Sequence, residues 1–253
     1  MSEPSESVVL VEGYDDRDFW KGLLLHLGCT EARSGPPSPH RETAVFSYQG
    51  AARQLVHISP YKAPTPRRPQ GMELSAAVRI KLDGRRTKPL SRLVIASDAD
   101  LHPTLADARK SVHDLLLREC PDVSETAEGD FSIEGGSLLV STSFLHGGAA
   151  RDADGRLPPG VPEQPAMEQL VCAALREVYP DRLDAITRWL ADRPSPTGKL
   201  HKAHAWSHYA GWFTDHGTGD FYSALWRDER VAEALLRLLK QQGALRIIES
   251  LVR

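Results

Sequence analysis

Two short acidic clusters, each preceded by a run of apolar residues, constrain this chain more than any other feature. The first cluster, residues 12–16, follows the apolar residues 8–11, and the second, residues 98–100, follows the apolar residues 93–96. Short uninterrupted apolar runs are typical of strands that are buried on both faces, as in a parallel sheet. Parallel strands end at one edge of a sheet, so carboxylates that follow two such strands can face a common crevice. The pattern therefore predicts an α/β fold.

The two clusters admit two interpretations. Clustered carboxylates repel one another unless a cation lies among them, and Mg²⁺ commonly takes one or two protein carboxylates together with a phosphate. Asp98 and Asp100, as a pair at a strand end, suit such an ion. Alternatively, acidic residues at the start of a helix only cap its free N–H groups. Two clusters in matching contexts favour a site for a metal-bound phosphate.

The order of these motifs resembles the Toprim domain of type IA topoisomerases, bacterial primases, recombination mediators and OLD-family nucleases. Residues 11–16, Val-Glu-Gly-Tyr-Asp-Asp, look like the Val-Glu-Gly-x-x-Asp form of OLD-like nucleases. Residues 97–103 are similar to the Asp-Ala-Asp-x-x-Pro stretch of a compact, little-characterised Toprim branch. The pairs Met167-Glu168 and Lys202-Ala203 resemble two further pairs of that branch. The resemblance spans roughly the whole chain in the order of elements.

The resemblance implies a Toprim-like parallel sheet flanked by helices, and a nuclease that hydrolyses phosphodiester bonds with Mg²⁺ or Mn²⁺. Glu12 would be a metal ligand or a general acid or base, and Lys202 would neutralise phosphate charge. Asp16 would join the site because residues four apart are neighbours on a helix. The metal ligands implied in this way are Glu12, Asp16, Asp98, Asp100 and Glu168.

A basic segment lies between the two acidic clusters. Residues 51–95 contain ten basic and two acidic side chains, a balance of +8, although the whole chain has a net charge of −3. Such a segment can anchor a phosphate backbone if its charges share one face, and otherwise it only keeps a loop soluble. Beside a metal-phosphate site, binding is favoured, and the expected partner is nucleic acid, with DNA favoured over RNA. The expected nucleic-acid-binding residues are Arg67, Arg68, Arg85, Arg86 and Lys88.

Composition and length exclude several classes of protein. A chain of 253 residues with 41% hydrophobic residues is long enough for a packed α/β core and is not disordered or fibrous. The three cysteines are isolated, so they indicate reduced thiols and neither a disulfide framework nor a Cys-x-x-Cys zinc site. The sequence shows no leader and no apolar run of membrane-spanning length, so a cytoplasmic protein is expected.

The order of elements predicts three parts: a Toprim-like core over residues 1–145, a flexible loop over residues 146–165 and a helical C-terminal portion over residues 166–253 that packs on the core. Strands are expected at residues 8–12, 44–48, 90–96 and 137–142. Helices are expected at residues 15–27, 51–58, 104–120, 166–179, 181–192, 199–213 and from residue 230 to the end. Residues 76–82 fit either a helix before a strand or one arm of a hairpin.

Two other functions remain open beside the nuclease. One is a Toprim module that holds nucleic acid or a partner protein without cutting. The other is a toxin or defence component whose activity appears only with a partner ATPase, whereas the nuclease itself would act in phage defence or DNA repair. A topoisomerase is disfavoured, because no tyrosine stands in a recognisable nucleophile context. His201, His204 and His208 share one helical face, but ligands on one straight helix rarely complete a zinc tetrahedron.

Overall fold

The computed structural model describes residues 6–32, 46–49, 54–64, 69–84, 90–99, 102, 104–191 and 221–252. The chain separates into two compact units. Unit 1 consists of Met1–Ser97, His102–Ser143 and Ile247–Arg253, and unit 2 of Asp98–Leu101 and Phe144–Arg246. The chain therefore leaves the first unit directly after one of its strands, at the second acidic cluster.

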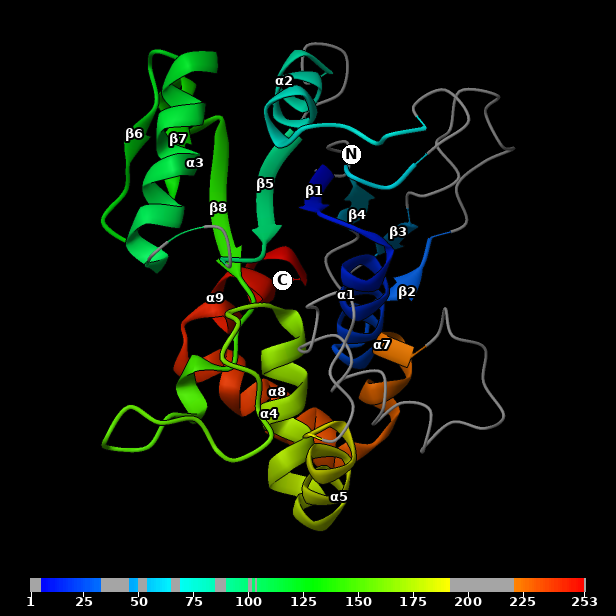
Figure 1. Cartoon of the computed structure of the whole chain (residues 1–253). Helices are drawn as coiled ribbons and strands as arrows, with labels where there is room; N and C mark the ends of the chain where they lie inside the picture. Colours follow the sequence, from blue (N-terminus) through cyan, green and yellow to red (C-terminus); the bar gives the residue numbers. More distant parts are fainter. Residues whose placement is uncertain are drawn as a thin grey trace. The chain divides into compact units, whose positions relative to one another are not determined.

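Unit 1 is built on an eight-stranded sheet in the order β2-β3-β4-β1-β5-β8-β7-β6 (Figure 1). Its strands are β1 (Glu6–Val11), β2 (Thr30–Glu31), β3 (Phe46–Gln49), β4 (Leu55–Pro60), β5 (Leu90–Ser97), β6 (Ser124–Glu125), β7 (Phe131–Ile133) and β8 (Leu138–Phe144). The strand β1 pairs in parallel with both β4 and β5. Towards the edges the pairs β2–β3, β3–β4, β6–β7 and β7–β8 are antiparallel.

The two apolar runs form the centre of this sheet. In β1, residues 8–11 are all buried, and in β5 the same holds for residues 93–96. Neither strand alternates between buried and exposed residues, which is the pattern of parallel strands covered on both faces. The predicted strands at these two places are therefore confirmed.

The helices of unit 1 follow its strands in chain order. They are α1 (Tyr14–His26), α2 (Leu74–Gly84) and α3 (Leu105–Glu119), and the end of α9 (Ala244–Val252) belongs to the same unit. In α1, the large side chains of Phe19 and Trp20 are fully buried, and the helix ends before Gly28, which has a φ of +85°. That φ suits glycine, so the helix stop that the sequence indicates is confirmed.

The helix α3 shows how capping and periodicity set an element. Its N-cap Thr104 accepts a hydrogen bond from the backbone N–H of Asp107 at 3.1 Å. Its buried side chains recur at helical spacing and are Ala108, Val112, Leu115 and Leu116. Leu105, three residues before Ala108, is 42% exposed because it lies in the first turn, ahead of the buried stripe.

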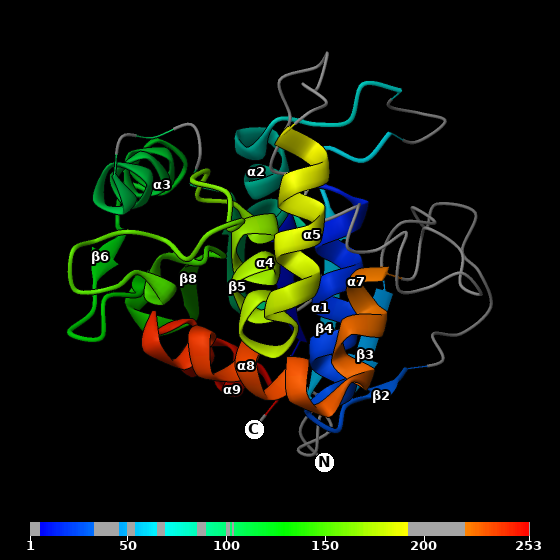
Figure 2. The ribbon, with the colours of Figure 1, turned by 60° about the horizontal axis from the view of Figure 1, so that its bottom comes forward.

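Unit 2 is helical. It contains α4 (Met167–Val178), α5 (Pro180–Ala191), α7 (Phe221–Ala224) and α8 (Glu229–Gln241), with short 3-10 turns at η2 (Gly148–Ala150) and η4 (Leu225–Arg227). The helix α4 packs against both α5 and α8 (Figure 2). Nine consecutive residues of α4, from Met167 to Leu175, are buried, so α4 is the central helix of this unit.

The α/β fold with a sheet, flanking helices and a helical C-terminal portion is confirmed. Two expected elements are wrong. Residues 55–58, expected in a helix over residues 51–58, belong to β4, where Val56 and Ile58 alternate with the less buried Leu55 and His57 and pair with β1; residues 51–53 lie outside the described ranges. The last helix is two helices, since Gly243 adopts a φ of +80° between α8 and α9. The expected helix at residues 199–213 lies outside the described residues.

Candidate functional site

The carboxyl ends of three parallel strands meet at one edge of the sheet in unit 1. The strand β1 lies between β4 and β5, with Val11 opposite Pro60 and Leu10 opposite Ile95. Glu12 is the first residue after β1. The sheet thus carries Glu12 at the carboxyl edge of its central strand, the edge at which α/β proteins bind ligands.

Glu12 forms an ion pair with a lysine that the sequence reasoning did not select. The Nζ of Lys62, two residues after β4, lies 2.5 Å from Oε2 of Glu12. The Lys62 side chain is 47% exposed and the Glu12 side chain 21%. The signal in the sequence is a six-residue alternation of apolar residues in β4, which is too short to separate a strand from a helix and so to locate Lys62 after a strand end.

Asp16 caps the helix on which it lies. Its Oδ2 accepts a hydrogen bond from the backbone N–H of Gly13 at 2.9 Å. Gly13 is the N-cap of α1, and Asp16, the third residue of the helix, binds back to the backbone N–H of this N-cap as in one half of a capping box. One oxygen of this carboxylate therefore serves as a helix cap.

Asp98, the first residue of unit 2, caps another helix. Its Oδ1 accepts a hydrogen bond from the backbone N–H of Met167 at 3.1 Å, and the N–H of Ala99 donates to the carbonyl of Pro165 at 3.1 Å. The N-cap of α4 is Ala166, which offers no side-chain acceptor, so Asp98 supplies one from a distant part of the sequence. The second cluster is thereby attached to the first turn of α4.

Glu168 lies in that first turn. Glu168 is only 1% exposed, and the helix dipole favours a negative charge at its position. Cys172, one turn further along α4, is fully buried, and burial together with the charge of Glu168 raises the pKa of its thiol strongly. The first turn of α4 therefore gathers two acidic residues, Asp98 as its cap and Glu168 as its second residue.

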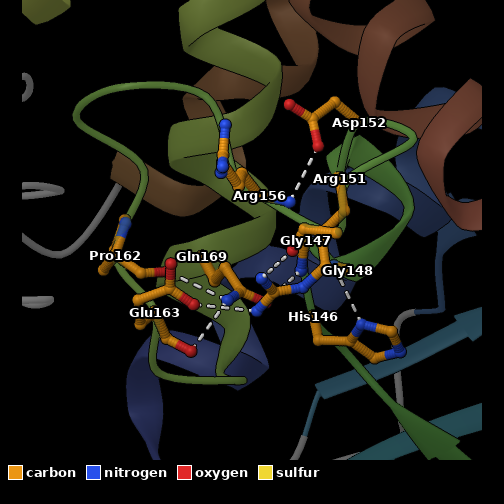
Figure 3. Close-up of polar contacts among 10 residues, drawn as sticks. His146, Gly147, Gly148, Arg151, Asp152, Arg156, Pro162, Glu163 and Gln169 are labelled. Carbon is orange, nitrogen blue, oxygen red and sulfur yellow. Dashed lines mark hydrogen bonds and ion pairs between the residues drawn. The ribbon is translucent and has the colours of Figure 1, made fainter.

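The segment before α4 is held by a buried glutamine. The Oε1 of Gln169 accepts from the N–H of Gly147 at 2.8 Å, and its Nε2 donates to the carbonyls of Pro162 and Glu163 at 2.9 and 3.1 Å (Figure 3). Gly147 approaches so closely that a Cβ there would lie 2.6 Å from the carbonyl oxygen of Gln169. Where the sequence suggests a loop, these contacts join both ends of residues 147–163 to α4.

His146 begins this segment and has one tautomer available. Its Nδ1 accepts a hydrogen bond from the N–H of Gly148 at 3.0 Å, so Nδ1 carries no proton (Figure 3). Burial, with a smaller contribution from the charge of Arg151, lowers the pKa of His146 below its ordinary value. The neutral imidazole is therefore part of the fold of this segment.

Several expected site residues lie outside the described ranges. They are Asp100, Lys202, Arg67, Arg68, Arg85, Arg86 and Lys88, together with His201, His204 and His208. Of the basic segment that the structure does describe, Arg79 forms a two-point ion pair with Glu119, with both N–O distances at 2.9 Å. This pair raises the pKa of Arg79 and lowers that of Glu119.

The donor chemistry of the described candidates suits a hard divalent cation. Glu12, Asp16, Asp98 and Glu168 all offer carboxylate oxygens, the ligands that Mg²⁺ prefers. Within the ranges given above, no group of three or more His, Cys, Asp or Glu side chains is arranged to hold a metal ion. Asp100, the second carboxylate of the Asp98 motif, lies outside these ranges.

The three cysteines are buried and form no disulfide; they are Cys29, Cys120 and Cys172. Among the described helices, none combines the length and the apolar character that a membrane span requires.

Comparison with known proteins gives a fold without a function. No family model matches the chain, and no curated protein matches it either. A solved structure, the crystal structure of hypothetical protein PH0156 from Pyrococcus horikoshii OT3, is similar, with a TM-score of 0.68 and 18% sequence identity. The match covers 98% of this chain and 100% of the other. At this identity the similarity shows the shared fold alone.

Proposed function

We propose that this protein is a metal-dependent nuclease of the Toprim type, which hydrolyses phosphodiester bonds in nucleic acid. The observation that carries the proposal is the strand order β4-β1-β5 with parallel pairing. Because of this order, the two strands that the acidic motifs follow are neighbours. Glu12 comes directly after β1, and Asp98 directly after β5. Helix caps alone do not require the two acidic motifs to follow neighbouring parallel strands.

The local contacts of Asp98 support the same proposal. Its hydrogen bond to the first N–H of α4 fixes one carboxylate oxygen, and Asp100 follows it two residues later in the sequence of the motif. Glu168, which the resemblance associates with a second metal position, is the next residue after that N–H. Asp98 thereby acquires a fixed orientation, as a ligand carboxylate needs.

The reaction would be the attack of water on phosphorus, with cleavage of one P–O bond to leave a phosphate monoester and a free hydroxyl. Mg²⁺ or Mn²⁺, when bound, would polarise the phosphate and lower the pKa of the attacking water. Asp98, Asp100 and Glu12 would hold the cation or, in the case of Glu12, accept the proton of the water. Lys202 or an arginine of the basic segment would stabilise the charge on the pentavalent phosphorus.

A plasmid nicking assay tests this proposal. Purified wild-type protein is compared with Asp98→Asn/Asp100→Asn in Mg²⁺, in Mn²⁺ and in EDTA. The matched control is Asp114→Asn, which removes one negative charge from the exposed side of α3. Cleavage that needs the metal, persists in the control and is lost in the double variant is expected.

The alternative functions are distinguished in the same experiment. Binding of DNA without cleavage by the wild type would indicate a non-catalytic module or an effector that needs a partner ATPase. Cleavage by the double variant at the wild-type rate would refute the assignment of the acidic motifs, whatever the activity of the protein.

The basic segment is tested separately. Arg85→Ala/Arg86→Ala should weaken DNA binding, and the slope of log affinity against log salt should fall by about two, since each lost phosphate contact contributes roughly 0.9. Arg188→Ala/Arg227→Ala removes the same charge from exposed positions of unit 2 and serves as the control. Equal slopes for both double variants and the wild type would mean that the segment is only a solvated loop.

A further inference from the structure

The ion pair between Lys62 and Glu12 is fixed by its backbone. The N–H of Tyr61 donates to the carbonyl of Val11 at 2.9 Å, and the N–H of Lys62 donates to the carbonyl of Glu12 at 2.8 Å. These two bonds join the residues that follow β4 to the end of β1 and to Glu12. The backbone of Lys62 is therefore held beside that of Glu12, at the carboxyl edge of the sheet.

The same segment is held from its other side. The N–H of Met72 donates to the carbonyl of Tyr61 at 2.7 Å. Gly71 has a φ of +73°, and a Cβ at this residue would lie 2.2 Å from the carbonyl oxygen of Lys62. Only glycine allows this approach. The backbone of Lys62 thus contacts the end of β1 on one side and residues 71–72 on the other, unlike the backbone of a lysine on a loose surface loop.

A third contact connects the segment to the start of α1. The hydroxyl of Tyr14 donates to the carbonyl of Pro64 at 3.1 Å. Residues 61–64 therefore lie beside residues 11–14 in space. The ammonium of Lys62 lies next to the first acidic cluster, residues 12–16. The half-exposed ammonium is accessible to a ligand that approaches Glu12.

We propose that Lys62 is a phosphate-binding residue of the candidate site, paired with Glu12 until a divalent cation occupies that carboxylate. The proposal rests on the proposed function and deepens it by naming the residue that contacts the substrate phosphodiester. A divalent cation and an ammonium compete for the same carboxylate oxygen, because their charges repel each other. Lysine has three donors on a flexible stem, so the displaced ammonium can turn to a non-bridging phosphate oxygen.

Metal affinity provides the first test and needs no catalysis. Calorimetric titration with Mn²⁺ compares the wild type with Lys62→Met, and Lys110→Met on the exposed side of α3 is the control of equal charge. Removal of the competing ammonium should tighten Mn²⁺ binding by about two- to fivefold, the range of a half-exposed ion pair. The control should bind Mn²⁺ like the wild type.

Substrate binding provides the second test. The same variants are compared for their Kd on a short DNA duplex with Mn²⁺ present, measured by fluorescence anisotropy. Lys62→Met should weaken binding by about three- to tenfold, whereas Lys62→Arg, which keeps the charge, should stay within about twofold of the wild type. Opposite changes in metal and DNA affinity are not expected of a lysine that only holds Glu12 in place.

The outcomes separate this proposal from the nuclease itself. If Lys62→Met tightens Mn²⁺ binding and weakens DNA binding while the wild type cuts no DNA, Lys62 keeps its assignment and only the nuclease proposal fails. If both affinities equal those of the wild type, or if the wild type binds no Mn²⁺, the assignment of Lys62 is overturned. Cleavage by the wild type in that case leaves the nuclease proposal standing.

Discussion

Replacement of Asp98 separates the capping role of this carboxylate from repulsion within its cluster. If repulsion by neighbouring carboxylates dominated, Asp98→Asn would stabilise the metal-free protein. The structure predicts the opposite sign for Asp98→Ala, because Oδ1 of Asp98 accepts the N–H of Met167, a residue 1% exposed. Without Asp98, that N–H at the start of a buried helix would have no side-chain acceptor at its N-cap.

The expected size follows from the cap and from burial. Loss of an N-cap side chain costs about 1 kcal/mol, and a buried donor left without its partner adds roughly another 1 kcal/mol. A total of about 2 kcal/mol corresponds to a fall in Tm of about 4–8 °C for a chain of this size. Asp98→Asn keeps an acceptor and loses only the charge at the helix N-terminus, so a fall of about 0.5 kcal/mol is expected.

Thermal unfolding in EDTA, followed by circular dichroism, measures this difference. The control is Thr104→Ala, which removes the cap of α3 and should cost about 1 kcal/mol. Only the Asp98 variants should also lose Mn²⁺ affinity, since Thr104 lies outside the candidate ligand set. A Tm of Asp98→Ala equal to or above that of the wild type, with Thr104→Ala lowered as expected, would refute the capping argument.

Three further predictions concern the segments around the candidate site. Gly71→Ala should destabilise the fold by more than about 2 kcal/mol in urea unfolding, because its Cβ would clash with the carbonyl of Lys62. The control Gly155→Ala, at a φ of +78° with open space around it, should cost only about 1 kcal/mol. Equal losses for the two variants would contradict the close approach of Gly71 to Lys62. Gln169→Leu should cost about 2–3 kcal/mol, since one buried and two partly buried hydrogen bonds are lost, and a loss below about 0.5 kcal/mol would mean that the segment is held by other contacts. The pKa of His146 is lowered in the folded state, so its contribution to stability is complete above its unfolded pKa of 6.5 and is lost as the pH falls below that value. Urea unfolding at several pH values should therefore show a smaller loss between pH 7 and pH 5 for His146→Gln than for the wild type, and identical pH dependence would refute this assignment.

The sequence determined the central strands and the position of the acidic motifs. Runs such as residues 8–11 and 93–96 leave no polar face, so they fit only the middle of a sheet covered on both sides. Helices such as α3 were also predictable, because a cap and a regular apolar stripe are local features. The strand β4 was missed, since a run of six residues with His57 and Ser59 inside it is too short for periodicity to separate strand from helix.

Only the tertiary structure decided which groups meet. That Lys62 pairs with Glu12 depends on β4 lying beside β1, and 50 residues separate the two side chains in the sequence. That Asp98 caps α4 depends on a contact across 69 residues. Such pairs leave no local signal, because hydrogen bonds and ion pairs act between atoms near in space. The sequence by itself thus identified carboxylates that could hold a metal, and the fold determined that Glu12 pairs with Lys62 and that Asp98 caps α4.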